Sequence, residues 1–105
     1  SDHAISWGNI FSVGTPNYYI YFYSPTCSHC ADLKDWIIAT ALGRGDIYFV
    51  KASENDVIKN SIASSIGAND ISEVSILGYP SLIEIVNGVI TKNVAGKTAI
   101  QTLLK

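Results

Sequence analysis

The sequence has little of what nucleic-acid-binding, membrane-spanning or disulfide-stapled proteins need. Its 105 residues carry 7 basic and 9 acidic side chains, for a formal net charge of -2. No basic run or stripe is present, which argues against a nucleic-acid partner. No apolar stretch approaches the ~20 residues of a membrane span, and the longest, Tyr18 to Tyr23, is only as long as a strand. We therefore expect no nucleic-acid partner and no membrane span in this chain.

Methionine is absent, and cysteine occurs only twice. We therefore expect the initiator either to have been removed or to lie outside this sequence. Removal of a leader or anchor, which we favour over removal of the initiator alone, would place the protein outside the cytoplasm. The two cysteines, Cys27 and Cys30, lie three positions apart. One such pair cannot form the multiple disulfides that staple small secreted folds, so we expect the two thiols to act together.

What is present is the composition of a folded domain. Hydrophobic residues make up 48% of the chain, too many for a disordered segment of low hydrophobicity and high charge. The length is that of one domain, and no repeat, low-complexity tract or linker interrupts it. The sequence thus predicts a single domain over residues 1–105, which we expect to be a monomer.

The hydrophobic pattern predicts an α/β fold. The run Tyr18 to Tyr23 is typical of a buried central strand, and a helical pattern follows from Ser28 to Leu42, with Gly43 as its C-terminal cap. A second strand is expected from Asp46 to Ala52. Strand, helix and strand in about 30 residues form a βαβ unit, so these two strands are predicted to be parallel.

The flanking segments complete the expected architecture. Further elements are predicted as follows: a short helix within 3–13, a helix that starts with a capping box at Ser53 and ends at Gly67, a helical turn and loop within 68–78, a hairpin of Ser81 to Val86 and Val89 to Val94 around Asn87-Gly88, and a helix from Lys97 to Lys105. This order favours one mixed sheet of four or five strands flanked by helices, which we place on both faces.

The informative motif is Cys27-Ser28-His29-Cys30 at the start of the first long predicted helix. The first turn of a helix has unpaired backbone N–H groups and partial positive charge, which stabilise a thiolate, the reactive form of cysteine. Cys27 is therefore predicted to be the more exposed, attacking thiol and Cys30, one turn into the helix, the more buried, resolving thiol. The imidazole of His29 could stabilise the Cys27 thiolate and make the disulfide a better oxidant, or it could be a solvated surface side chain.

Two other interpretations of the cysteine pair stay open. The pair could be half of a zinc or copper site, but zinc needs four ligands, and His3 and His29 are the only histidines in the sequence. Carboxylates or a second chain would have to supply any further ligands. The chain could also be a binding scaffold in which the thiols are secondary. We expect neither a metal nor a cofactor.

A second motif, Gly78-Tyr79-Pro80, precedes the predicted hairpin. Proline cannot donate a hydrogen bond to a sheet ladder, so it suits the first position of a strand. Local sequence favours a trans bond before Pro80, because only ~5–6% of X–Pro bonds in folded proteins are cis.

Taken together, these motifs resemble the thioredoxin superfamily over nearly the whole chain. The resemblance is carried by Cys27-Ser28-His29-Cys30 after a strand, by Gly78-Tyr79-Pro80 before the hairpin, by Asn87-Gly88 within it, and by Gly96 before the last helix. It implies that the Tyr79–Pro80 bond is cis, that Pro80 faces the cysteine loop, and that the backbone of Tyr79 pairs with an extended substrate segment. The implied activity is thiol–disulfide exchange with protein substrates and a redox-recycling partner.

The sequence also departs from standard thioredoxins. They usually carry a buried acid six residues before the first cysteine, where this chain has Tyr21, and Trp-Cys-Gly-Pro-Cys, where this chain has Thr26 and Ser28-His29. The loop after Gly67 looks longer than usual. A histidine before the second cysteine is similar to disulfide oxidases and isomerases, and Pro-Thr-Cys-Ser-His-Cys resembles small accessory thioredoxins of Gram-positive bacteria. We therefore expect an oxidase or isomerase rather than a general reductase.

Overall fold

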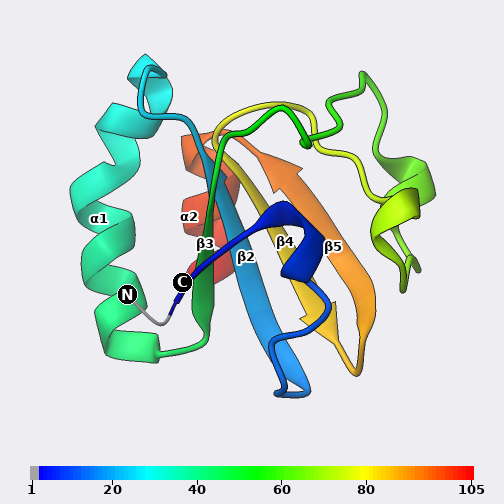
Figure 1. Ribbon diagram of the computed structural model, residues 1–105. Coiled ribbons are helices and arrows are strands. Elements are labelled where there is room, and N and C mark those ends of the chain that lie inside the picture. Colours follow the sequence, from blue (N-terminus) through cyan, green and yellow to red (C-terminus); the bar gives the residue numbers. More distant parts are fainter. Residues whose placement is uncertain (1–2) are drawn as a thin grey trace.

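A mixed five-stranded sheet forms the centre of the computed structural model, which describes residues 3–105 (Figure 1). The strands are β1 (Ala4–Ile5), β2 (Asn17–Tyr23), β3 (Ile47–Lys51), β4 (Ser81–Val86) and β5 (Val89–Ala95). Their spatial order is β1-β3-β2-β4-β5. The first three strands are mutually parallel where they pair, and β4 is antiparallel to both β2 and β5. The predicted mixed sheet is confirmed, as is the hairpin, in which Asn87 and Gly88 both have positive φ.

Strand β2 is the central strand, and its side chains alternate between the two faces of the sheet. Tyr18, Ile20 and Phe22 belong to the core on one face, whereas Tyr21 belongs to the core on the other, with Tyr19 packed against it. Because successive side chains of a strand point to opposite faces, β2 contributes to both cores. Its aromatic and β-branched residues fit this doubly covered position.

Both helices, α1 (Ser28–Arg44) and α2 (Lys97–Leu104), pack on the same face of the sheet. Their buried side chains join those of the sheet in one cluster: Tyr21, Leu33, Ile37, Ile47, Leu82, Ile100 and Leu104. The expectation of helices on both faces is therefore wrong. The other face is covered by irregular chain that includes the 3₁₀ turns η1 (Trp7–Asn9) and η3 (Ile71–Glu73). In Figure 1, η1 lies in front of the sheet, and η3 lies at the right together with a third 3₁₀ turn, η2 (Ala63–Ser65).

The predicted helix between Ser53 and Gly67 does not form. One half of the expected capping box is present, since the Asp56 carboxylate accepts a hydrogen bond from the Ser53 N–H at 3.4 Å. Ser53 Oγ, however, accepts from the Asn55 N–H at 3.3 Å instead of from that of Asp56. The chain then becomes extended instead, and Ile58 forms a parallel bridge with Ile76. β-branched residues at 57 and 58 favour extended backbone, and the serines and asparagine that follow are weak helix formers.

The predicted helix within residues 3–13 is also replaced by other structure. Ala4 and Ile5 form the short edge strand β1 beside Phe49 and Val50 of β3, and only one 3₁₀ turn follows. The apolar residues at helical spacing in this segment are buried without forming a helix, since Trp7 and Ile10 both lie in the core. Gly8, within that turn, is a poor helix former.

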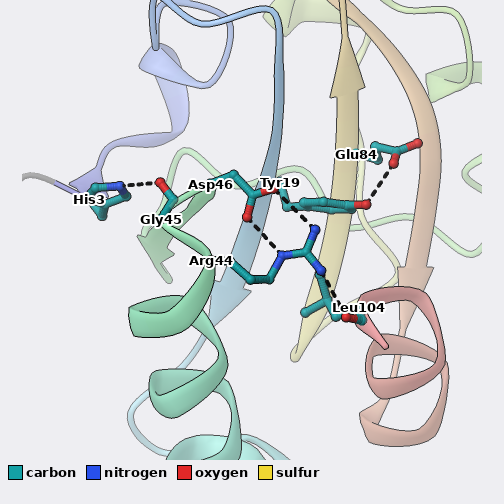
Figure 2. Close-up of polar contacts among 7 residues, drawn as sticks. All are labelled: His3, Tyr19, Arg44, Gly45, Asp46, Glu84 and Leu104. Atoms are coloured by element: carbon teal, nitrogen blue, oxygen red, sulfur yellow. Dashed lines mark hydrogen bonds and ion pairs between the residues drawn. The ribbon is translucent and has the colours of Figure 1, made fainter.

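At its C-terminal end, α1 runs past the predicted cap at Gly43 and ends at Gly45, which has φ 76° and donates its N–H to Ala41 O. Only the second glycine adopts the left-handed conformation of a cap. The last helical residue, Arg44, binds Asp46 through two nitrogens at 2.9 and 3.2 Å and donates to Leu104 O at 2.9 Å (Figure 2). Its guanidinium also lies 5.0 Å from the centre of the Tyr19 ring. Arg44 thereby ties α1 to the sheet and to α2.

Candidate active site

The cysteine pair lies where β2 gives way to α1. Cys27 is the N-cap of α1, with extended backbone, and Cys30 lies in the first turn. Both thiols are free; Cys27 is half-buried, whereas only 6% of Cys30 is exposed. The predicted placement of both residues at a helix start is thus observed, with the difference in exposure that the two expected roles require.

Backbone amides of the first helical turn stabilise the Cys27 thiolate. The pKa of Cys27 is lowered, chiefly by a hydrogen bond from the Cys30 backbone N–H, and further by the Cys30 thiol and the His29 backbone N–H. Partial burial opposes this effect only in part. Such N–H groups have no partner within the helix, so they are free to serve the thiolate. Cys27 is therefore easier to ionise than an ordinary cysteine, and a thiolate is the reactive form of cysteine.

Cys30 has the opposite character. Burial raises its pKa to about 11, and the neighbouring Cys27 adds to the increase. The Ser24 N–H, at 3.5 Å from Cys30 Sγ, offsets a part of it. The protein thus holds one thiol ready to ionise and keeps the other neutral.

The second motif meets the first at Cys27. The Cys27 thiol donates to the carbonyl oxygen of Tyr79 at 3.5 Å, although 52 positions separate the two residues. The Tyr79–Pro80 peptide bond is cis, and Pro80 is buried. The structure gives the backbone N–H of Tyr79 no hydrogen-bond partner within residues 3–105. This loop therefore presents a free backbone donor next to the more reactive thiol.

One contact at the site was missed at the sequence level. The Tyr79 hydroxyl donates to the carboxylate of Asp56, and both burial and this hydrogen bond raise the pKa of Tyr79. The sequence pattern around Asp56 indicates only a capping box. No sequence signal links positions 56 and 79, because the contact depends on how the irregular segment after β3 folds back over the sheet.

The two residues between the cysteines are exposed. Ser28 and His29 both face solvent, and the hydrogen bonds that act on Cys27 come from backbone amides and from Cys30. Among the described residues, the backbone N–H of His29 therefore stabilises the Cys27 thiolate, whereas its imidazole makes no hydrogen bond to Cys27.

A cleft of about 360 Å³ lies beside the buried thiol, between α1 and the sheet. Tyr21, Cys30 and Phe49 are among its lining residues, and Lys34 contributes its only charged side chain. The Tyr21 hydroxyl is buried and has no hydrogen-bond partner within the described chain. Burial raises the pKa of Tyr21, and the charges of Cys30 and Cys27 raise it further. Its hydroxyl therefore lies within electrostatic range of both thiols.

No three side chains of His, Cys, Asp or Glu within residues 3–105 are grouped so that they could hold a metal ion. None of the helices in the same range is both long and apolar enough to cross a membrane.

Comparison with solved structures identifies the fold. Spinach chloroplast thioredoxin f superposes with a TM-score of 0.63 at 15% identity, over 95% of this chain and 78% of that one. A Plasmodium falciparum thioredoxin gives 0.61 at 16% identity over 96% and 94%, and mitochondrial thioredoxin 3 of Saccharomyces cerevisiae gives 0.59 at 15% over 99% and 97%. Comparison with protein-family models and with curated protein sequences found no match. The chain has the thioredoxin fold.

Proposed function

We propose that this chain, built on the thioredoxin fold, exchanges disulfides with protein substrates through Cys27 and Cys30. The observation that carries the proposal is the asymmetry of the pair: a half-buried thiol of lowered pKa beside a buried thiol of raised pKa. Two idle cysteines would not require different environments, whereas an attacking and a resolving thiol do.

The proposed exchange has two steps, attack by Cys27 and resolution by Cys30. The Cys27 thiolate attacks a substrate disulfide, so one sulfur of the substrate bonds to Cys27 and the other leaves as a thiolate. The Cys30 thiolate then attacks Cys27 Sγ, the Cys27–Cys30 bond forms, and the second substrate sulfur leaves. The proton lost by Cys30 returns through solvent to the departing thiolate. With the Cys27–Cys30 disulfide as the starting state, the same steps in reverse oxidise a substrate dithiol. No cofactor enters either direction.

Tyr79 and Pro80 position the substrate in this proposal. The free backbone N–H of Tyr79 lies on the loop whose carbonyl contacts Cys27. An extended substrate segment could add to this loop as a strand does to a sheet edge. Its cysteine would then lie near Cys27 Sγ, and substrates would be selected by backbone shape more than by sequence.

We further propose that the pair favours oxidation or isomerisation. Amides that stabilise the Cys27 thiolate stabilise the reduced protein and so make its disulfide a better oxidant. We also propose that the exposed imidazole of His29, which lies between the two cysteines in the sequence, helps to stabilise the Cys27 thiolate. A recycling partner is then required to restore the starting redox state.

Two measurements test the proposed function. Exchange with a disulfide-bonded model protein should be lost in Cys27→Ser, and an unchanged rate would overturn the proposal in favour of a binding scaffold. Equilibration of the pair against a glutathione series should give a potential above the roughly -270 mV of thioredoxin. A value at or below that figure would contradict the oxidising direction while leaving the exchange activity intact.

A further inference from the structure

The hydroxyl of Tyr21 is unexplained by packing alone. It is buried without a hydrogen-bond partner in the described chain, which costs free energy relative to a phenylalanine of the same shape. Tyr19, two residues earlier on the same face of β2, instead donates its hydroxyl to Glu84 at 2.9 Å. The protein therefore satisfies one of these two tyrosines and leaves the other unsatisfied.

The position of Tyr21 connects it to Cys30. Both residues line the cleft between α1 and the sheet, and the charge on either cysteine acts on the Tyr21 hydroxyl. The Ser24 N–H is the one hydrogen-bond donor other than Cys27 that the structure places on Cys30 Sγ within residues 3–105. A buried thiolate with one backbone donor is poorly compensated, and Tyr21 offers a nearby, unused O–H.

We propose that Tyr21 is a positioning residue for the resolving step, and that its hydroxyl donates a hydrogen bond to the Cys30 thiolate, directly or through one water in the cleft. This inference rests on the proposed exchange reaction. When Cys27 is tied up in a mixed disulfide, Cys30 must lose its proton to solvent and attack Cys27 Sγ. The hydrogen bond stabilises the thiolate before attack, and it is released when the Cys27–Cys30 bond forms and the substrate sulfur leaves.

This role explains why the Tyr21 hydroxyl has no hydrogen-bond partner in the described residues. In the resting dithiol, Cys30 is neutral and held by the Ser24 N–H, so the Tyr21 O–H has no anion to serve. Hydrogen bonds to charged sulfur or oxygen are stronger than those to neutral groups. The unsatisfied donor is thus a cost of the resting state that is recovered when Cys30 ionises.

Stopped-flow reaction with the aromatic disulfide dithiobis(nitrobenzoate) separates the two steps, because attack by Cys27 and resolution by Cys30 each release one coloured thiolate. In Tyr21→Phe, the first release should match the unsubstituted protein. The second should be about tenfold slower at neutral pH, the equivalent of one pKa unit, and its pH profile should move to higher pH. Tyr23→Phe is the matched control, since Tyr23 lines the same cleft and stacks on Tyr21 with 6.1 Å between ring centroids.

The outcomes separate this inference from the function on which it rests. If the unsubstituted protein releases no thiolate or only one, the exchange proposal fails. If it releases two and Tyr21→Phe matches Tyr23→Phe in rate and pH profile, only the role of Tyr21 is overturned.

A second measurement does not require turnover. In a Cys27→Ser background, the pH dependence of Cys30 alkylation by iodoacetamide should move upward on adding Tyr21→Phe and stay in place on adding Tyr23→Phe. A purely structural role of Tyr21 would leave this titration unmoved. Thermal unfolding of Tyr21→Phe should be no easier than that of the unsubstituted protein, because a buried unsatisfied group has been removed.

Discussion

The polar groups at the two ends of α1 differ in how fully they are hydrogen-bonded. At the C-terminal end, Arg44 binds Asp46 and Leu104 and lies over the ring of Tyr19, whose own hydroxyl is bound by Glu84 (Figure 2). At the N-terminal end, backbone amides of the first turn act on Cys27 Sγ, and the nearby Tyr21 keeps a buried hydroxyl without a partner in the described residues.

The contrast suggests that the C-terminal end of α1 serves the stability of the fold and the N-terminal end serves the proposed reaction. Groups that are satisfied in the resting state contribute to folding, whereas groups left unsatisfied or with shifted pKa values are available for a reaction. The helix therefore acts as an anchor at one end and as a source of free amides for Cys27 at the other. Substitutions at the two ends should affect different measurements.

The largest expected effect is that of Cys30→Ser at the reactive end. Cys27 would still attack a substrate disulfide, but nothing could displace it, so turnover should stop and the mixed disulfide should accumulate. Mass spectrometry of the intact protein after reaction detects the adduct. Free turnover without an adduct would show that Cys30 does not resolve, and Ser28→Ala, between the same cysteines, should form no lasting adduct.

At the anchoring end, Arg44→Met should lower the free energy of unfolding and leave exchange untouched. The bonds from Arg44 to Asp46 and Leu104 are lost, but the side chain is 33% exposed, so solvent screening limits the loss to about 1–2 kcal/mol. Denaturant unfolding and the exchange rate are the two measurements. If the exchange rate of Arg44→Met changed under conditions where the variant is fully folded, the two ends of α1 would not act independently. Arg44→Lys, which keeps the charge and loses the planar fork, should fall in between.

Replacing either of two tyrosines on the same face of β2, Tyr19 or Tyr21, should change the free energy of unfolding in opposite directions. Tyr19→Phe removes a hydrogen bond to Glu84 and should destabilise the protein by about 0.5–1.5 kcal/mol, whereas Tyr21→Phe should stabilise it slightly. Paired denaturant titrations measure both. If both variants lose stability equally, the Tyr21 hydroxyl has a partner in solution and the contrast between the tyrosines disappears.

The two thiols should give the reduced protein a stability maximum near pH 8–9. The pKa of Cys27 is lowered on folding, so its contribution is present above the unfolded value of about 8.5 and is lost as pH falls through its folded pKa. The pKa of Cys30 is raised to about 11, so its contribution is present below about 8.5 and is lost as pH rises through 11. Unfolding of the reduced protein and of a Cys27→Ser, Cys30→Ser double variant across pH isolates both effects. Identical profiles would contradict them.

The smallest effect is expected from His29→Ala. Because the imidazole is exposed and backbone groups dominate at Cys27, the reduction potential should become more negative by less than about 30 mV, a tenfold change in equilibrium constant. Equilibration of both proteins with the same glutathione series measures the shift. A shift well beyond this size would assign His29 a direct role.

The sequence predicted the sheet and the cysteine site well because both depend on local signals. The aromatic run of β2, the Asn87-Gly88 turn and the placement of Cys27 at a helix start all follow from patterns within a few residues. The bounds of α1 and α2 were predicted to within about two residues. The error at the end of α1 arises because Gly43 and Gly45 are both possible caps.

What the sequence could not predict depends on contacts between distant segments. Helical spacing from 53 to 67 is compatible with an extended path once Ile58 can pair with Ile76, and propensity alone does not decide between the two. The Asp56–Tyr79 hydrogen bond depends on that same path. The cis bond before Pro80 was expected only from resemblance, since local preference favours trans.

The irregular cover of one sheet face has a consequence for how the molecule opens. Few backbone hydrogen bonds hold residues 53–66, whereas β2 is paired along nearly its whole length on both sides. Amides in the cover should therefore exchange with deuterium through small local openings, while those of β2 should wait for global unfolding. Since the cover reaches Tyr79 through Asp56, an incoming polypeptide would meet a surface that yields on one side of the reactive sulfur and stays fixed on the other.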